Sequence, residues 1–205
     1  AVPEIIKNQL FQYTPLKTSF SSNMLALKET KPMTVTLHDG LSHFIDFRRD
    51  VITKRTVFKL NKAREKANIL IGLAIAVNNI DAIIDLIKKS KNPAEAKTKL
   101  LNTKWSVKSN ITQYIKLINP SFKISASKIL LDEEQAKAIL ELRLQKLTAL
   151  ERDDLFNNLK SLVDDINNYL KILNSNKQLL KVLKDELSEI KDNFATPRKT
   201  EIQKH

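Results

Sequence analysis

The feature that most constrains the fold is the stretch from Gly40 to Asn78, which contains no proline and consists largely of helix-forming residues. A continuous helix over this stretch would be about 58 Å long at a rise of about 1.5 Å per residue. A compact domain of a chain this size cannot cover such a helix along its whole length. We therefore expect an extended helical arm, with Asp39 capping its start because its carboxylate can accept the free amide hydrogens of the first turn.

An extended arm needs a second helix to cover its apolar side. Phe44, Val51 and Phe58 recur every seven residues, with Leu41, Phe47 and Ile52 beside them, and this stripe predicts the side of the outgoing arm that makes the contact. A later segment supplies the partner, because its apolar residues follow alternating steps of four and three, the spacing of a left-handed coiled coil. These residues are Leu155, Leu159, Leu162, Ile166, Tyr169 and Leu173. The two segments together predict a long antiparallel coiled-coil stem.

The return arm contains a signal for a break within "LNSNKQ". Asn174 and Ser175 compete with the helix for backbone hydrogen bonds and suit a helix end followed by a new cap. The sequence therefore predicts two return helices, in line or at an angle. One unbroken helix is the alternative.

The stretch between the arms, residues 79–150, is too long for a turn and predicts a small helical domain at the tip of the stem. Asn92 followed by Pro93, and Asp132 with Gln135 three residues later, are typical helix starts. Before the stem, "MTVTLHDG" alternates polar and apolar residues and predicts one edge strand in an otherwise irregular segment.

These patterns predict a mainly α protein with five parts. The parts are an irregular or short-stranded segment at 1–38, the outgoing stem helix at 39–78, the tip domain at 79–150, the return stem helices at 151–194 and a tail at 195–205. The composition agrees, because two glycines are too few for a sheet built on tight hairpins. The chain has no cysteine for a disulfide or a thiolate metal site, and its longest apolar run is well short of the roughly 20 residues that span a membrane.

The net charge of +12 is concentrated in the middle of the chain, with +4 over 39–78 and +7 over 79–130, whereas 131–205 sum to −1. A basic surface attracts polyanions such as nucleic acid. The candidates for weak contact with nucleic acid on the outgoing arm are Arg48, Arg49, Lys54, Arg55, Lys59, Lys62, Arg64 and Lys66. The simpler interpretation is that these side chains form the solvated face of a stem helix.

Residues that often serve catalysis or metal binding are not arranged for either here. No arginine precedes Tyr13, Tyr114 or Tyr169, and the last of these falls in the stem seam. The two glycines are too far apart for a phosphate-binding loop, and the three histidines lack ligand spacing. The acidic run at 132–134 opens a helix, which favours a cap over a Mg²⁺ site. We expect no catalytic, metal or cofactor site in this chain.

The tip domain carries more apolar residues than one helix face can hold in "LDEEQAKAILELRLQKL". A helix that is apolar on more than one side needs two partners, here its own domain and a second molecule. The candidate two-fold interface is Ile80, Ile83, Ile139, Leu142 and Leu144. The alternative is that all five belong to the internal core.

Five stretches occur in order along the chain, namely "PLKTSFSSNMLAL", "HFIDFRRDVITKRTVFKLNKAREKANILIGLAIAVNNIDAIIDLIKKS", "PAEAKTKLL", "LDEEQAKAILELRLQKLTALE" and "FATPRKTEI". Together they resemble the A subunits of bacterial type IIA topoisomerases. The fourth stretch and the closing "RKTEI" resemble DNA gyrase more than topoisomerase IV, whose equivalent region is the alternative. Two readings from other classes are a structural coiled coil and a basic nucleic-acid-binding module, and neither explains the ordered matches.

The resemblance implies a piece of a longer, cytoplasmic and chromosome-associated enzyme, comprising the tower end, the coiled-coil stem and the exit gate. In this family a tyrosine N-terminal to the present chain cleaves DNA, so this piece alone should be inactive. The resemblance also implies a homodimer, contact with double-stranded DNA and partnership with the B subunit of gyrase. Mg²⁺ and ATP belong to the complete enzyme, with ATP bound on the B subunit.

Overall fold

The computed structural model describes residues 2–28, 30–107, 109–118, 128–142 and 149–202. The side chains of residues 109–110 and 149–152 lie outside that description. The chain divides into two compact units, Ala1–Arg48 and Arg49–His205, which are described separately.

The first unit contains a helix, a hairpin and the start of the long helix. Helix α1 (Pro3–Tyr13) has proline in its first turn, where a missing amide hydrogen costs nothing. Strands β1 (Met24–Lys28) and β2 (Lys31–Val35) pair antiparallel, with Thr30 in the turn at a φ of 73°. The predicted edge strand is therefore confirmed in part, as half of a hairpin, whereas α1 was not predicted because the segment was interpreted as irregular.

Helix α2 (Leu37–Asn78) begins before Asp39, so the predicted cap at Asp39 is wrong. Thr36 precedes the helix, and its backbone N–H and hydroxyl donate to Asp39 Oδ2 at 3.2 and 2.6 Å. The Asp39 N–H donates in return to Thr36 Oγ1 at 3.2 Å. This reciprocal arrangement makes Thr36 the cap and Asp39 its partner inside the first turn. The hydrogen bond from the Thr36 hydroxyl, followed by the one from its backbone N–H, holds the pKa of Asp39 below the ordinary value.

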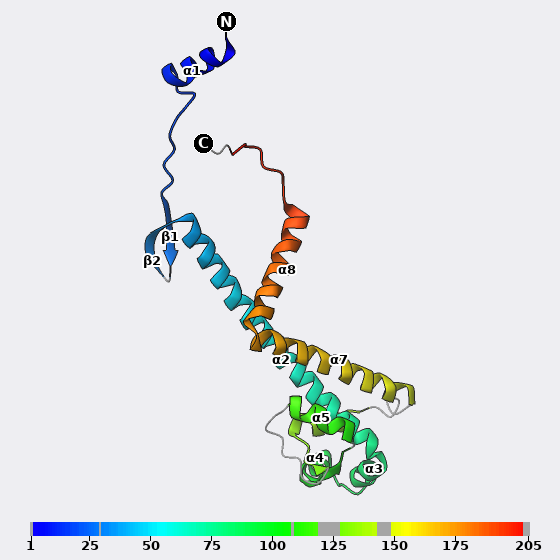
Figure 1. Ribbon diagram of the computed structural model, residues 1–205. Coiled ribbons are helices and arrows are strands. Elements are labelled where there is room, and N and C mark those ends of the chain that lie inside the picture. The colour runs from blue at the N-terminus through cyan, green and yellow to red at the C-terminus, as the bar shows by residue number, and fades with distance from the viewer. Residues whose placement is uncertain (1, 29, 108, 119–127, 143–148, 203–205) are drawn as a thin grey trace. The chain divides into compact units, whose positions relative to one another are not determined.

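The second unit gathers short elements around the C-terminal end of α2 (Figure 1). They are α3 (Ile80–Lys88), α4 (Pro93–Asn102), β3 (Trp105–Ser106), α5 (Ser109–Ile118), β4 (Lys128–Ile129) and α6 (Glu133–Leu140). The predicted starts of α4 and α6 are confirmed: Asn92 caps α4, and Asp132 forms a capping box with Gln135. Strand β3 pairs antiparallel with β4, which connects Trp105 to Ile129.

The bend between α2 and α3 is 88° and falls at Asn79. The Asn79 amide donates to the carbonyls of Ile75 and Ser106, and its Oδ1 accepts from the Ser106 hydroxyl at 2.6 Å. Within the described residues no single helix is both long and apolar enough to cross a membrane; α2 and α3 meet that test only when taken together across the bend.

The return arm consists of α7 (Ala149–Asn174) and α8 (Asn176–Phe194). The predicted break is confirmed, because only Ser175 separates them. Ser175 has an extended backbone conformation, and its side chain makes no capping hydrogen bond. The break therefore depends on the backbone preference of the "NSN" sequence and not on a side-chain cap.

Candidate functional site

The contact between α2 and α7 forms one part of the stem. Leu159 and Ile166 of α7 are fully buried, and Val163 beside them is 5% exposed. The other predicted seam residues with described side chains, Leu155, Leu162, Tyr169 and Leu173, are partly buried against the same core. A groove between the helices is lined by Lys66, Ile69 and Leu70 on one side and by Asn158, Ser161 and Leu162 on the other.

On α2 only part of the predicted stripe is buried. Phe58 is 64% exposed and Phe44 is 48% exposed, whereas Ile52 is fully buried. Further along α2 the buried positions are held largely by small side chains: Thr56, Ala63, Ala67 and Ala74, together with Leu60 and Ile71. Small residues allow neighbouring helices to approach closely, so this seam is built from short side chains and not from the aromatic residues that recur every seven positions.

The contact between α2 and α8 forms a second, separate cluster. Ile52 packs with Leu179 and Leu183 of α8, and Ile172, Val182 and Leu187 surround them partly buried. Since Ile172 lies at the end of α7 and contacts the Ile52 cluster, while Leu162 lies beside Ile69 and Leu70, α7 runs antiparallel to α2. The far end of α8 is exposed, with Phe194 at 77%.

The arginines of the predicted basic set hold elements together. Arg49 donates from Nη2 to Asn176 Oδ1 at 3.3 Å, next to the break in the return arm. Arg55 forms an ion pair with Glu186 of α8. Arg64 points a guanidinium N–H at the carbonyl of Leu117, near the C-terminal end of α5, where helix carbonyls lack internal partners. These three side chains therefore stabilise the packing of α8 and α5 against α2.

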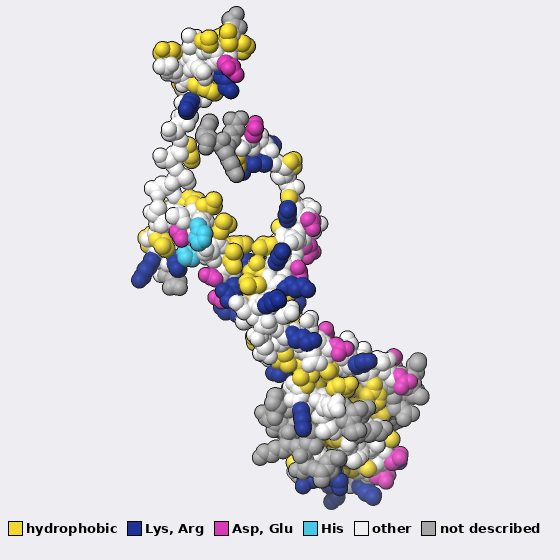
Figure 2. All heavy atoms as spheres, in the orientation of Figure 1, with side chains coloured by type: hydrophobic (Ala, Val, Ile, Leu, Met, Phe, Trp, Pro, Cys, Tyr) yellow, Lys and Arg dark blue, Asp and Glu magenta, His cyan; other side chains and the backbone are white. Residues whose placement is uncertain are grey.

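The lysines of the same set face solvent. Lys54, Lys59 and Lys66 are exposed, and none of them forms an ion pair with another described residue. Lys62 pairs with Glu65 at 2.8 Å, and the hydrogen bond from this pair raises the pKa of Lys62. Arg48 is partly exposed and belongs to the first unit. Lys and Arg side chains are visible along the stem, interspersed with Asp and Glu (Figure 2).

The candidate dimer residues are divided by the structure. Ile83 and Ile139 are 2% and 4% exposed and belong to the core of the single chain, so they offer no free surface. Ile80 and Leu142 are partly exposed, and Leu144 lies outside the described residues. Among the described candidates, Ile80 and Leu142 are therefore the ones that remain accessible.

The closest approach in the tip lies between α2 and α6. Gln135 is fully buried, and its Nε2 donates to both the carbonyl and the side-chain oxygen of Asn68 at 3.0 Å. The Asn68 amide donates in turn to Asp132 Oδ2 at 2.5 Å. Gly72 faces Gln135 so closely that an added Cβ would meet the Gln135 Cβ and Cγ at 2.7 Å. Sequence reasoning identified Asp132 and Gln135 as a capping pair but missed that the same pair joins α6 to α2.

The groups considered for chemistry have structural roles. Asp132 caps α6, and Glu133 forms an ion pair with Lys97 at 2.9 Å. Tyr114 and Tyr169 pack against the core, while Tyr13 is 76% exposed. Within the described ranges no group of three or more His, Asp or Glu residues is placed to hold a metal ion.

Comparison with known proteins identifies the family to which this chain belongs. Residues 1–188 match the family of the A subunits of DNA gyrase and topoisomerase IV. The chain belongs to this DNA gyrase/topoisomerase IV family. It is 46% identical over 203 residues to the DNA gyrase A subunit of Rickettsia bellii and 47% identical over 203 residues to that of Rickettsia felis. Each alignment covers 98% of this chain and 22% of the relative.

A third gyrase A subunit, from Buchnera aphidicola subsp. Baizongia pistaciae, is 45% identical over 211 residues, which cover 97% of this chain and 25% of that relative. The chain thus spans 22% to 25% of the length of these gyrase relatives. It corresponds to one region of the whole polypeptide, and that region is the one with the long α2 helix and its return arm.

Proposed function

We propose that this chain supplies the coiled-coil stem and the exit gate of the A subunit of an ATP-dependent type II DNA topoisomerase. The observation that supports this most directly is the path of the chain: α2 leads into a helical body, and α7 returns antiparallel along α2. A gate needs a helical body carried on a stiff stem. The enzyme changes DNA supercoiling by passing one duplex through a double-strand break in another, and this region releases the transported duplex.

Gyrase is the better assignment than topoisomerase IV. The three relatives compared above are all A subunits of DNA gyrase, at 45% to 47% identity. The proposal carries the division into a tower end at 1–38, an outgoing stem helix at 39–78, a gate domain at 79–150, return helices at 151–194 and a tail at 195–205.

The partners follow from this assignment. The complete enzyme is a heterotetramer of two A subunits and two B subunits that acts on double-stranded DNA in the bacterial cytoplasm. We assign ATP to the B subunits and Mg²⁺ to the complete enzyme, and we expect no site for either in this chain. The chain contributes mechanical parts and a dimer contact, and no reacting group.

Sedimentation equilibrium of the 205-residue chain at micromolar concentrations and two salt levels tests the gate assignment. An exit gate must hold two subunits together, so we expect a mass near twice 23.5 kDa, about 47 kDa, at both salt levels. A stable monomer of 23.5 kDa under all conditions would contradict the assignment of the dimer contact to this chain.

Substitution at the tip locates the contact. The double variant Leu142→Asp with Leu144→Asp places two charges on the candidate interface, where burial without partners is costly. We expect it to sediment as a folded monomer. The matched control is Ile190→Asp on α8, a residue that is 51% exposed and far from the tip in sequence, and it should stay dimeric. A dimeric Leu142→Asp, Leu144→Asp variant would place the interface elsewhere.

A further inference from the structure

The turn between α3 and α4 has the highest density of lysine in the chain. Residues 88–104 contain six lysines and a single carboxylate, Glu95. Three of these lysines, Lys88, Lys89 and Lys91, fall within four positions and are all exposed. In the space-filling view Lys and Arg side chains gather at the lower end of this unit, where α3 and α4 lie (Figures 1 and 2).

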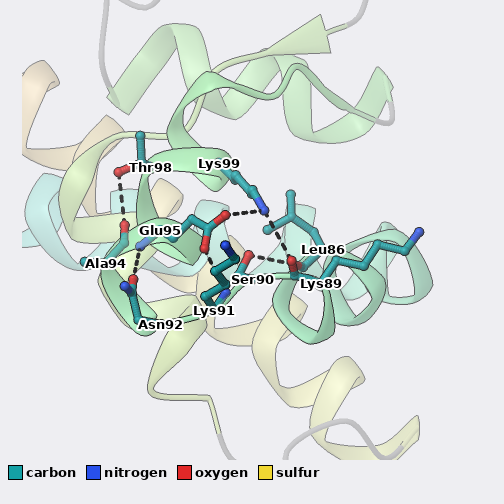
Figure 3. Close-up of polar contacts among 9 residues, drawn as sticks. All are labelled: Leu86, Lys89, Ser90, Lys91, Asn92, Ala94, Glu95, Thr98 and Lys99. Carbon is teal, nitrogen blue, oxygen red and sulfur yellow. Dashed lines mark hydrogen bonds and ion pairs between the residues drawn. The ribbon is translucent and has the colours of Figure 1, made fainter.

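The backbone of this turn is fixed by its own polar contacts (Figure 3). The Ser90 hydroxyl donates to the Leu86 carbonyl at 2.8 Å, and the Lys91 N–H donates to Glu95 Oε2 at 2.8 Å. Asn92 Oδ1 accepts from the Glu95 N–H at 2.7 Å and starts α4. Because these partners satisfy the turn, the ammonium groups of the three exposed lysines are not needed to hold it.

Two carboxylates near the turn are neutralised by other lysines, whereas Asp85 on α3 is exposed and forms no ion pair with another described residue. Glu95 pairs with Lys99 at 2.8 Å, and Glu133 of α6 pairs with Lys97 at 2.9 Å. In contrast, no carboxylate of the described residues lies within ion-pair distance of Lys88, Lys89 or Lys91. The last turn of α3 does contribute a favourable interaction with Lys88 through the helix dipole, but this interaction leaves the charge exposed to solvent.

We propose that Lys88, Lys89 and Lys91 form a surface that binds the phosphate backbone of double-stranded DNA without sequence preference. Three positive charges on a fixed turn complement the regular negative charge of a duplex, and their neutralisation releases condensed counterions. The turn carries no arginine, asparagine or glutamine pair aimed outward that would read base edges, so the contact is with phosphate. The choice of DNA over other polyanions rests on the proposed function. The surface itself lies on the tip and is separate from the stem lysines.

The test measures binding of the 205-residue chain to a fluorescently labelled mixed-sequence duplex by anisotropy at salt concentrations from about 50 to 200 mM. The variant replaces Lys88, Lys89 and Lys91 by Gln. The slope of log K against log salt is negative, and each lost phosphate contact reduces its magnitude by about 0.9, so three lost contacts reduce it by about 2.7. Over this fourfold range of salt, wild-type affinity should therefore fall about 40-fold more than that of the variant.

Two control variants make the same change of charge elsewhere. Lys177, Lys181 and Lys184 are exposed on α8, and their replacement by Gln should change the slope much less. Replacement of Lys54, Lys59 and Lys66 by Gln tests the stem in the same assay, so failure of the tip surface and failure of the stem proposal are distinguishable. Fluorescence of Trp105, the single tryptophan, which is 4% exposed, verifies that each variant folds.

Three results would overturn the inference. One is an equal loss of affinity in the tip and α8 variants, which would mean that only net charge matters. Another is an absence of DNA binding by the wild-type chain at about 50 mM salt. The third is unchanged DNA binding in the tip variant together with lost binding to vesicles of anionic phospholipid, which would assign the turn to a membrane surface instead.

Discussion

At the scale of single residues, the close approach of α2 and α6 depends on Gly72. A Cβ at this position would meet the Gln135 Cβ and Cγ at 2.7 Å and the Gln135 Cα at 3.3 Å. The Gln135 backbone cannot move without disturbing its hydrogen bonds to Asn68 and Asp132. We therefore expect Gly72→Ala to destabilise the second unit by about 1–3 kcal/mol, despite the better helix propensity of alanine.

Urea unfolding followed by Trp105 fluorescence measures this change, because Trp105 is buried in the same core and its indole N–H donates to the Leu100 carbonyl at 3.0 Å. Gly40→Ala is the matched control. Nothing lies within 4 Å of the Cβ that it would add, so the free energy of unfolding should stay at the wild-type value or rise by at most about 1 kcal/mol. Equal urea midpoints for Gly72→Ala and wild type would show that α2 and α6 can move apart enough to accept the added Cβ.

The roles of single residues could be predicted from the sequence where the interacting residues are close together in the chain. Asn92 and Asp132 were predicted as caps because a capping side chain accepts a hydrogen bond from a backbone N–H only three positions later. The second role of Gln135, its hydrogen bonds to Asn68, was not predictable, since the two residues are 67 positions apart and meet only in the folded chain. Asp39 was misassigned because Thr36 competes for the same role, and a single sequence does not indicate which of two capping residues the helix uses.

At the scale of elements, the helix starts of α4 and α8 differ in a way that stability measurements can detect. Asn92 accepts a hydrogen bond from the Glu95 N–H, whereas Ser175 makes no side-chain cap. We expect Asn92→Ala to cost about 1 kcal/mol, and Ser175→Ala to cost less than about 0.5 kcal/mol. Urea midpoints of the two variants test the difference. A larger loss at Ser175 would mean that its hydroxyl caps α8 in solution.

The same start of α4 makes a contribution to stability that depends on pH. The ion-paired hydrogen bond from Lys99, followed by the hydrogen bond from the Lys91 N–H, lowers the pKa of Glu95 below its ordinary value of 4.5. A carboxyl whose pKa is lower in the folded state stabilises that state above pH 4.5 and loses this contribution as the pH falls through the lowered value.

We therefore expect Glu95→Gln to be less stable than wild type at pH 7. The difference in urea midpoint should shrink as the pH falls below 4.5 and vanish once Glu95 of the wild type is protonated. Asp164→Asn on α7 is the matched control, because this exposed carboxylate has no ion-pair partner within the described residues. A Glu95→Gln difference that stays constant from pH 7 to pH 3 would assign the effect to lost packing and not to charge.

The elements also show what heptad reasoning can and cannot predict. Leucine and isoleucine recur on α7 at the spacing of a seam, and the structure buries Leu159 and Ile166 of that set completely. On α2 the recurrence of Phe44, Val51 and Phe58 was conspicuous, yet the buried face contains Thr56, Ala63 and Ala67. Small side chains carry little hydropathy signal, so a pattern that weights large apolar residues found the buried Ile52 but missed these smaller residues.

At the scale of the whole molecule, the long α2 helix was the easiest feature to predict, because neither proline nor a turn sequence interrupts it. The gate surface was the hardest. Sequence alone does not distinguish an apolar residue that packs within one chain from one that packs against a second copy, and the structure places Ile83 and Ile139 in the first class. Residues that are buried within a single chain can be removed from the predicted interface. Among the described candidates, Ile80 and Leu142 then remain.

The last prediction concerns the basic stem in the working enzyme. Arg49, Arg55 and the buried guanidinium of Arg64 hold elements together, so their substitution would confuse stability with function. Lys54, Lys59 and Lys66 are exposed and can be replaced by Glu without removing any contact described above. In the complete enzyme, reconstituted from full-length A and B subunits, we expect this triple change to slow strand passage on the order of tenfold. The proposed function has the transported duplex pass beside the stem, and added negative charge on the stem repels a polyanion.

DNA cleavage, measured on the same preparations, should be unchanged, because the proposed function assigns no reacting group to this chain. The effect on strand passage should also weaken at higher salt, where exposed charges are screened. Replacement of the same three lysines by Arg is the matched control and should keep wild-type rates, since it preserves the charge. Equal losses of cleavage and strand passage in the Glu variant would indicate damage to the fold or to assembly. Unchanged strand passage in the Glu variant would show that the lysines are only the solvated side of a stem helix and that the outward charge of α2 has no part in transport.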